Sequence, residues 1–256
     1  MDPLTVSRHI SGNGTPAGLW RADPKLAGVP TVDLDALVAP GTRLVVVAPH
    51  PDDEILPCGG LLHLLAARGD PVLIVAVTDG EGSHPGSQEW PQARLKRVRE
   101  AETGAALTSL GLGHSATVRL GIADGGVSAG EVLLGARLQQ ILAPTDIVLT
   151  TWRYDGHPDH EASARACASA CKASGARLLE APVWGWHWSA PHDDAMPLER
   201  AVKLALTPVA LEHKRAALAC FHSQLTIDAS TGAAPIVAEW AIERILNPFE
   251  LFFHDA

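Results

Sequence analysis

Two short segments of the chain concentrate side chains that bind metals and move protons. The segment APHPDDE carries His50, Asp52, Asp53 and Glu54, and the segment GHPDHEAS carries His157, Asp159 and His160. Imidazole nitrogens and carboxylate oxygens are common ligands of catalytic zinc, which takes three protein ligands and keeps one position open for water. The metal lowers the pKa of that water to ~7 and so supplies a nucleophile near neutral pH. The two segments therefore predict a hydrolytic metal centre with acid and base groups to spare.

Helix capping is the alternative explanation for these residues. Asp52 or Asp53 could cap a helix that follows the first segment, because a short carboxylate accepts hydrogen bonds from the first amides of a helix. A cap needs one such side chain, whereas each segment contains at least three imidazole or carboxylate groups. Metal binding is therefore the preferred interpretation.

Both segments follow predicted strands. Residues 44–49 and 147–151 are apolar runs of the kind that is buried on both faces of a parallel sheet. Further strands are predicted at 71–80, 117–120, 177–183 and 202–206, and helices at 59–70, 94–110, 131–142, 161–174 and 209–221. This alternation predicts a doubly wound, mostly parallel α/β sheet of the Rossmann-like kind. In such sheets ligands bind beyond the carboxyl ends of the strands, where both polar segments lie.

The length of the chain fits one large domain. We expect this domain at residues 43–256, preceded by an N-terminal extension at residues 1–42 that is rich in glycine and proline and includes a short helix at 33–38. Neither polar segment lies in the first 30 residues. We therefore expect that part of the extension to be dispensable for chemistry.

Charge and hydropathy exclude several kinds of partner. A formal charge of −9 disfavours nucleic acid and anionic membrane surfaces, which attract basic proteins. No apolar run approaches the ~20 residues of a membrane span, and the N-terminus lacks the pattern of a secretory signal. Four cysteines are too few for a disulfide framework, and Cys167 and Cys171 are expected to be buried thiols. The sequence predicts a soluble, cytoplasmic protein without a membrane span.

The segment APHPDDEILPCGG resembles the opening motif of the LmbE-like, or PIG-L, family of zinc-dependent N-deacetylases. GHPDHEAS resembles the second metal motif of that family, and TDGEGSH, the helix with Arg97 and Glu100, and HKRAALACFHSQ are similar to its less specific features. The resemblance extends from about residue 43 onward. Where several relatives have a tyrosine two residues before the first histidine of the second motif, this chain has Asp155.

The resemblance implies a role for each residue of the two segments. His50, Asp53 and His160 correspond to the metal ligands, for Zn²⁺ or alternatively Fe²⁺. Asp52 corresponds to the general base, and His157 to a group that supports the oxyanion and protonates the leaving nitrogen. Asp159 would orient a histidine from behind.

The expected function is hydrolysis of an N-acetyl or other N-acyl group on an amino sugar or N-acetylglucosamine-type conjugate. The partner is then a small-molecule glycoconjugate, and a homo-oligomer is conceivable. The alternative is a non-catalytic sugar-binding or scaffold protein that retains the metal-binding fold. Asp52 argues against this alternative, because metal binding alone needs no base.

Aromatic and basic residues outside the two motifs give weaker signals. Trp184, Trp186 and Trp188 would share one face of an extended segment, where they could stack on sugar rings or pack in a core or interface. The basic residues Arg94, Lys96, Arg97 and Arg99 are expected to form a solvated helix face paired with Glu100 and Glu102.

Three polar residues near the expected crevice leave two interpretations open. Glu81 and His84 follow the second strand and are either substrate contacts or part of a solvated loop. His222 is expected to end the late helix, either near the site or in a capping role.

Overall fold

Eight strands form one sheet in the order β1-β7-β8-β6-β5-β2-β3-β4 in the computed structural model, which describes residues 8–254. Residues 1–7 of the expected extension and residues 255–256 of the expected domain lie outside the described residues. The strands are β1 (Thr31–Val32), β2 (Leu44–Ala48), β3 (Val72–Thr78), β4 (Ala116–Ile122), β5 (Ile147–Thr151), β6 (Arg177–Ala181), β7 (Ala201–Ala205) and β8 (Phe249–His254). All paired neighbours are parallel except β8, which runs antiparallel to β6 and β7. The predicted mostly parallel α/β sheet is confirmed.

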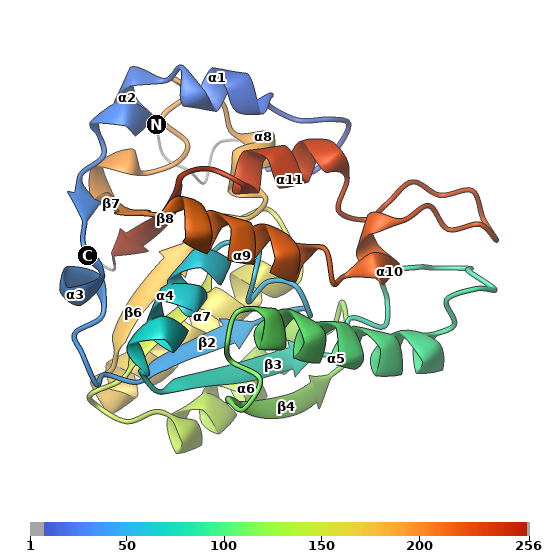
Figure 1. Cartoon of the computed structure of the whole chain (residues 1–256). Helices are drawn as coiled ribbons and strands as arrows, with labels where there is room; N and C mark the ends of the chain where they lie inside the picture. Colours follow the sequence, from blue (N-terminus) through green and yellow to red (C-terminus); the bar gives the residue numbers. More distant parts are fainter. Residues whose placement is uncertain (1–7, 255–256) are drawn as a thin grey trace.

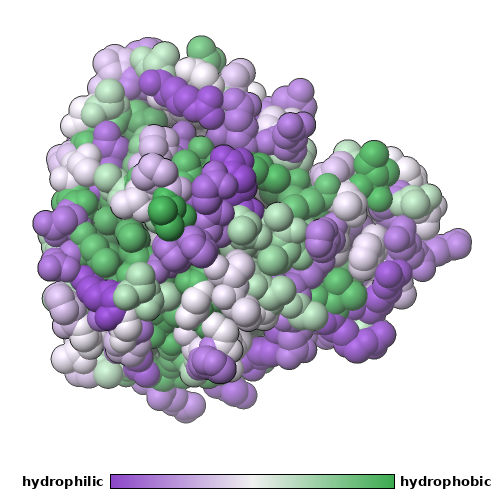
Figure 2. Space-filling model, in the orientation of Figure 1, coloured by the Kyte–Doolittle hydropathy of each residue, from purple (hydrophilic) through white to green (hydrophobic). Residues whose placement is uncertain are grey.

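Helices connect the strands and cover both faces of the sheet. They are α1 (Ala17–Arg21), α2 (Pro24–Gly28), α3 (Leu34–Leu37), α4 (Gly59–Arg68), α5 (Gln92–Ser109), α6 (Val127–Ile141), α7 (Pro158–Ser174), α8 (Gly185–Trp188), α9 (Pro208–Leu218), α10 (His222–Leu225) and α11 (Glu239–Ile245), with a 3-10 helix at Leu198–Arg200. Helices α4, α5 and α9 lie on one face, and α6 and α7 lie on the other (Figure 1). The outer surface of the layer that contains α4, α5 and α9 mixes polar and apolar residues (Figure 2).

The central strands show why the hydrophobic pattern predicts this arrangement. Leu44 and Val46 of β2 pack toward α4 and α9, whereas Val45 and Val47 pack toward α6 and α7. All of β2, β3 and β5 is buried, as expected for strands that are covered on both faces. Cys167 and Cys171 are buried on α7, among the helices α6 and α7, as expected.

The connections reverse direction at β2. From β2 the chain proceeds outward through β3 to β4, whereas β5 and β6 lie on the other side of β2. The carboxyl ends of β2 and β5 therefore lie side by side at a point where strand order reverses, which is the usual ligand position in open α/β sheets. The two polar segments follow these two strands.

A buried ion pair fixes the start of α4, the helix after the first polar segment. Lys214 on α9 donates to Glu250 on β8 across 2.7 Å, and both side chains are 1% exposed. The carboxylate of Glu250 also accepts the amides of Gly60 and Leu61 at 2.8 Å each. A carboxylate at this end satisfies free amides and complements the helix dipole. The pair therefore fixes the start of α4, which follows the first polar segment in the chain.

The segment before β2 packs on the rest of the protein. Strand β1 pairs in parallel with β7, and Trp20 of α1 is 3% exposed in the main core. The indole of Trp20 donates to the carbonyl of Trp186 at 2.9 Å. The helix expected at 33–38 is present as α3. The domain boundary at residue 43 stays a prediction.

Some expected elements differ from the structure. Helix α7 begins at Pro158, several residues earlier than expected, because proline is favoured at the first position of a helix. Helix α6 also begins earlier than expected, at Val127, whose amide donates to the carboxylate of Asp159. The late helix is interrupted after Leu218, so His222 begins the short helix α10 instead of ending α9. None of the described helices is long and apolar enough to cross a membrane.

The three alternating tryptophans do not share one face. Their segment is not extended, because α8 includes Trp186 and Trp188 and begins after Trp184. The ring of Trp186 packs edge-on against Trp20 at 5.3 Å, and that of Trp188 stacks on Trp152 at 5.8 Å. Trp186 is therefore a buried core residue, and the partly buried Trp188 packs against the same core.

Candidate metal centre

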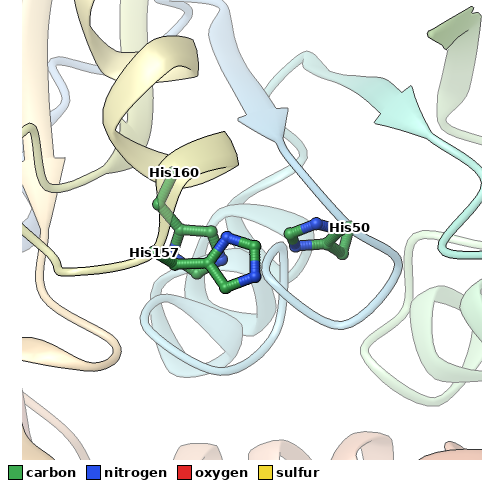
Figure 3. Close-up of side chains that lie close together, drawn as sticks. All are labelled: His50, His157 and His160. Atoms are coloured by element: carbon green, nitrogen blue, oxygen red, sulfur yellow. The ribbon is translucent and has the colours of Figure 1, made fainter. Parts of the chain in front are cut away.

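Three histidines from the two polar segments converge at the carboxyl ends of β2 and β5. His50 lies on the loop after β2, and His157 and His160 lie at the start of α7 (Figure 3). One ring nitrogen of each lies within 4.8 Å of those of the other two. His157 is the N-cap of α7, and His160 is in its first turn, so one helix start aims two rings at the loop of the third.

Asp53 lies between two of these rings. Its Oδ2 is 3.2 Å from Nδ1 of His50 and 3.1 Å from Nε2 of His160. Ligands bonded to zinc at 2.0–2.1 Å in a tetrahedron stand roughly 3.3 Å apart. Two of the three distances among these atoms, those that involve Asp53, therefore match the spacing of ligands on one ion.

Asp155 holds the other side of His160. Its Oδ2 is 2.8 Å from Nδ1 of His160, and its carboxylate also accepts the amides of Val183, Trp184 and Gly185. These hydrogen bonds keep the carboxylate in place, so that Nδ1 of His160 carries a proton and Nε2 is the atom that would bind a metal. Metal-ligating histidines are commonly oriented in this way.

Asp155→Asn is expected to weaken metal affinity by about 10–100-fold, because a neutral amide supports the basicity of His160 less well than a carboxylate does. Competition with a chromophoric chelator measures this affinity. The matched control is Asp146→Asn, since Asp146 is a buried carboxylate that binds Arg43 and the amide of Ala143 instead of a histidine. Equal metal affinity in the two variants would show that Asp155 does not support metal binding through His160.

His50 is held in the same way by two carboxylates. Its Nε2 is 3.3 Å from Oδ2 of Asp159 and 3.2 Å from Oδ1 of Asp124. Asp159 also accepts the amides of Gly125 and Val127 at the start of α6. A proton on Nε2 can donate to these carboxylates and leave Nδ1 directed at Asp53. His50, Asp124 and Asp159 form a second group with the spacing of metal ligands, but it shares His50 with the first.

His157 is fixed in a different protonation state. Its Nδ1 accepts the backbone amide of Asp159 at 3.3 Å. Burial, followed by the neighbouring His160 and His50 rings, lowers the pKa of His157 to about 3, so the ring is neutral at pH 7. With Nδ1 acting as an acceptor, the single proton lies on Nε2. His157 is therefore a hydrogen-bond donor at the cluster.

Asp52 has a backbone conformation that is rare outside glycine, with φ at 123°. Such a conformation costs about 1–3 kcal/mol and persists where neighbouring contacts fix it. The carboxylate of Glu54 accepts the Asp52 amide at 3.0 Å, and Arg99 donates to Oδ2 of Asp52 at 3.2 Å. Burial raises the pKa of the Asp52 carboxyl to about 7, although Arg99 lowers it. A nearby cation would hold this carboxyl ionised, as a base requires.

Arg99 is not part of a solvated helix face, which corrects the expectation from the sequence. It is 2% exposed and also donates to the carbonyls of Gly80 and Pro51. Gly80 has a φ of +65°, and a Cβ at this position would lie 2.1 Å from the Arg99 guanidinium, so glycine is needed there. Glu102 is buried as well, whereas Lys96 is half-exposed and pairs with Glu81 at 3.3 Å.

The charge balance of the centre fits a divalent cation. Four carboxyl groups contact the His50 and His160 rings, those of Asp53, Asp124, Asp155 and Asp159. Two more belong to Asp52 and Glu54 in the same loop as Asp53. Burial lowers the pKa of His160, but Asp53 and Asp155 more than offset it and raise the value to about 9. The same contacts lower the pKa of Asp53 despite its burial. Without an ion the cluster thus retains a proton, and a cation would replace that charge.

The cluster opens into a pocket of about 410 Å³, within the range for small-molecule sites. The lining is Ile10, His50, Asp52, Asp53, Leu56, Gly82, Ser83, Arg99, Asp124, His157, His160, Trp184, Gln224, Ile236 and Val237. Glu81, His84 and His222 are not in this lining, although Gly82 and Ser83 come from the loop that carries the first two. Trp184 is the one tryptophan of its segment that lines the pocket.

Gln224 presents a free acceptor at the pocket. The Ser223 hydroxyl donates to Glu102 at 2.7 Å, so its oxygen accepts from Nε2 of Gln224 at 2.9 Å. This fixes the amide with Oε1 as the remaining atom, and that buried oxygen has no partner among the described residues. The site thus offers an acceptor for an N–H or O–H group of a ligand.

Asp124, Arg99 and the supporting role of Asp155 were not predicted from the sequence. Asp124 lies just beyond the end of β4, so its position after a strand was the available signal. Arg99 and Asp155 act through contacts with segments remote in sequence, which a local pattern does not reveal.

Known proteins resemble the part of the chain that contains these site residues. A family model described as GlcNAc-PI de-N-acetylase, PIG-L, matches residues 45–171. A 1D-myo-inositol 2-acetamido-2-deoxy-alpha-D-glucopyranoside deacetylase of Mycolicibacterium gilvum is 26% identical over 181 residues, covering 60% of this chain and 61% of that protein. A probable N-acetyl-alpha-D-glucosaminyl L-malate deacetylase 2 of Bacillus cereus is 30% identical over 137 residues, covering 50% and 60%. The matches thus span less than two thirds of these relatives.

The fold has counterparts among solved structures. A conserved protein from Thermus thermophilus superposes with a TM-score of 0.59 at 26% identity, covering 83% of this chain and 94% of that chain. The family match contains both polar segments, with the three converging histidines and Asp53. The chain belongs to the PIG-L/LmbE family of GlcNAc-PI de-N-acetylase-like deacetylases.

Proposed function

We propose that the chain is a divalent-metal-dependent hydrolase that removes an N-acetyl group from an amino sugar or N-acetylglucosamine-type conjugate. The observation that carries the proposal is the position of Asp53 between His50 and His160, with a separate carboxylate on the far side of each ring. The two named relatives are deacetylases of N-acetylglucosamine conjugates, which supports the same chemistry here.

His50, Asp53 and His160 are the proposed ligands. A set of two imidazoles and one carboxylate suits Zn²⁺, and Fe²⁺ could occupy the same set. Three histidines form an alternative set in which His157 replaces Asp53. The amide of Asp159 disfavours that alternative, because it occupies Nδ1 of His157 and leaves the proton on Nε2.

Amide hydrolysis needs three contributions, which the residues at the cluster can supply. When bound, the metal polarises the carbonyl oxygen and makes water acidic. Asp52 takes a proton from the water that adds to the carbonyl carbon, and Nε2–H of His157 donates to the developing oxyanion. The C–N bond then breaks as the nitrogen gains the proton that Asp52 took from the water. The products are acetate and a free amine.

The proposal is tested by amine release from a panel of N-acetylglucosamine conjugates. Protein loaded with Zn²⁺ or, without oxygen, with Fe²⁺ should release amine and acetate in equal amounts from at least one conjugate. Asp52→Asn protein provides the background. If the metal-loaded protein binds these conjugates but releases no amine above that background, the non-catalytic sugar-binding alternative is correct.

A further inference from the structure

The segment at residues 8–16, called here the N-terminal strap, runs beside α8 and α11 (Figure 1). The Thr15 amide donates to the carbonyl of His187 at 2.9 Å, and the Thr15 hydroxyl donates to that of Ser189 at 2.6 Å. Arg244 donates to the carbonyls of Thr15 and Asn13. His187 and Arg244 are both 3% exposed, so the strap is held by buried side chains.

The far end of the strap contacts the second polar segment. Arg8 pairs with Glu161 of α7 at 3.5 Å, and Glu161 accepts the amide of Gly156 at 3.0 Å. The Arg8 carbonyl lies 2.7 Å from where a Cβ on Gly156 would be, next to His157. The strap therefore passes directly over the loop that presents two of the three clustered histidines.

Between these anchors, Ile10 lines the pocket that contains the metal cluster. Four further apolar side chains line the same pocket, namely Leu56, Trp184, Ile236 and Val237. Leu56 lies between the first polar segment and α4, Trp184 is the N-cap of α8, and the other two come from the loop before α11. A wall of this kind favours an apolar group on the ligand, because each Å² of apolar surface removed from water stabilises the complex.

We propose that the N-terminal strap forms an apolar subsite, through Ile10, for an alkyl or aryl group of the N-acyl amino-sugar substrate. This rests on the proposed function. The strap lies outside residues 45–171, to which the family model matches. Such a subsite also means that the first 30 residues take part in substrate selection, a role separate from the chemistry for which they are expected to be dispensable.

The apolar group could belong to the aglycone or to the acyl chain, and three substrates distinguish the two. These are the methyl and hexyl glycosides of N-acetylglucosamine and the methyl glycoside of N-hexanoylglucosamine. The wild-type protein should have a higher kcat/KM for one hexyl- or hexanoyl-bearing substrate than for the methyl glycoside. Which one is preferred identifies the source, and preference for neither contradicts the subsite.

Ile10→Ser should reduce this preference by roughly tenfold, since it removes most of the apolar surface of one side chain. The preference is the ratio of kcat/KM for the apolar substrate to that for the methyl N-acetyl substrate, so a general loss of activity cancels in it. The matched control is Leu19→Ser, because Leu19 is an exposed apolar residue of α1 that does not line the pocket. An unchanged preference in Ile10→Ser would overturn the proposal.

A second pair of variants moves the strap without changing Ile10. A Cβ on Gly14 would lie 2.6 Å from the ring of His187 and 2.7 Å from its carbonyl, whereas a Cβ on Gly12 meets nothing within 4 Å. Both glycines have φ near +60°, so alanine strains the backbone equally at the two positions. Gly14→Ala should therefore reduce the preference for the apolar substrate, and Gly12→Ala should not. Equal effects would contradict a role of the strap's position.

Binding separates failure of this inference from failure of the proposed function. Calorimetry with the hexyl and methyl glycosides of glucosamine, which contain no amide, does not require turnover. If no substrate is hydrolysed but the hexyl glycoside binds more weakly to Ile10→Ser than to Leu19→Ser, the subsite stands without the deacetylase. If substrates are hydrolysed and neither preference nor binding differs between these variants, the subsite is wrong and the deacetylase stands.

Discussion

Asp52→Asn is expected to reduce turnover by roughly 10²–10⁴-fold, the usual contribution of a positioned acid–base group. The fold should persist, because asparagine tolerates positive φ and the φ of Asp52 is 123°. Its amide oxygen can still accept the hydrogen bond of Arg99. Metal content should also persist, since Asp53 is the proposed carboxylate ligand. Amine release together with metal analysis of the purified variant measures both effects.

The pH dependence of turnover gives a second readout for Asp52. A base acts in its ionised form, so turnover falls as the pH decreases through its pKa. Burial raises the pKa of Asp52 to about 7, and a bound cation would lower it, so the acidic limb should lie below neutral pH. Asp52→Asn should lose the part of that limb that belongs to this carboxyl. An unchanged profile together with near-normal turnover would remove Asp52 from the mechanism.

Asp53→Asn is the informative counterpart of this variant. The two aspartates are adjacent, but only Asp53 contacts both His50 and His160. Asp53→Asn should therefore lose metal, whereas Asp52→Asn should lose turnover with its metal retained. The reverse result would show that the two carboxylates have exchanged roles.

The sequence predicts the framework of the site because that framework depends on local patterns. Residues of β2 and β5 form continuous buried apolar runs, and each polar segment follows directly after such a strand. Parallel strands place their carboxyl ends at one edge, so the convergence of His50 with His157 and His160 follows from the strand assignment.

The supporting residues depend on tertiary contacts, and the sequence does not reveal these. Arg99 has glutamates at helical spacing on its own helix, which suggests a solvated pair, but it binds Asp52 and Gly80 from two other loops. The carboxylate of Asp155 accepts hydrogen bonds from backbone amides almost thirty residues later in the chain. The N-terminal strap has no hydrophobic period, and its position is set by Arg244 near the end of the chain.

The same distinction explains the fold details that were not predicted. Residues 249–254 are mostly apolar, but such a pattern does not show that β8 will run antiparallel to β6 and β7. The spacing of the three tryptophans suggests an extended strand. Instead Trp186 and Trp188 pack against Trp20 and Trp152 from a helical turn.

Loss of metal in His160→Ala is the second large effect that we expect. Nε2 of His160 is 3.1 Å from Asp53, and Asp155 fixes the ring from behind. Removing this side chain deletes one of three proposed ligands and leaves two carboxylates facing an empty volume. The variant should therefore bind the ion far more weakly and release amine only at background rates. Circular dichroism should confirm that the fold is retained.

His213→Ala serves as the matched control for this variant. His213 is a partly buried histidine on α9 whose Nδ1 is 2.9 Å from the carbonyl of Ser109, away from the cluster. It should bind metal and release amine as the wild-type protein does. A general effect of losing a histidine would appear in both variants.

Metal stoichiometry measured beside amine release, in wild-type, His160→Ala and His213→Ala proteins, tests the central claim most directly. The account predicts one divalent ion per chain and amine release in the wild-type and His213→Ala proteins, and neither in folded His160→Ala. A folded His160→Ala protein that retains one ion per chain and releases amine at the wild-type rate would contradict it.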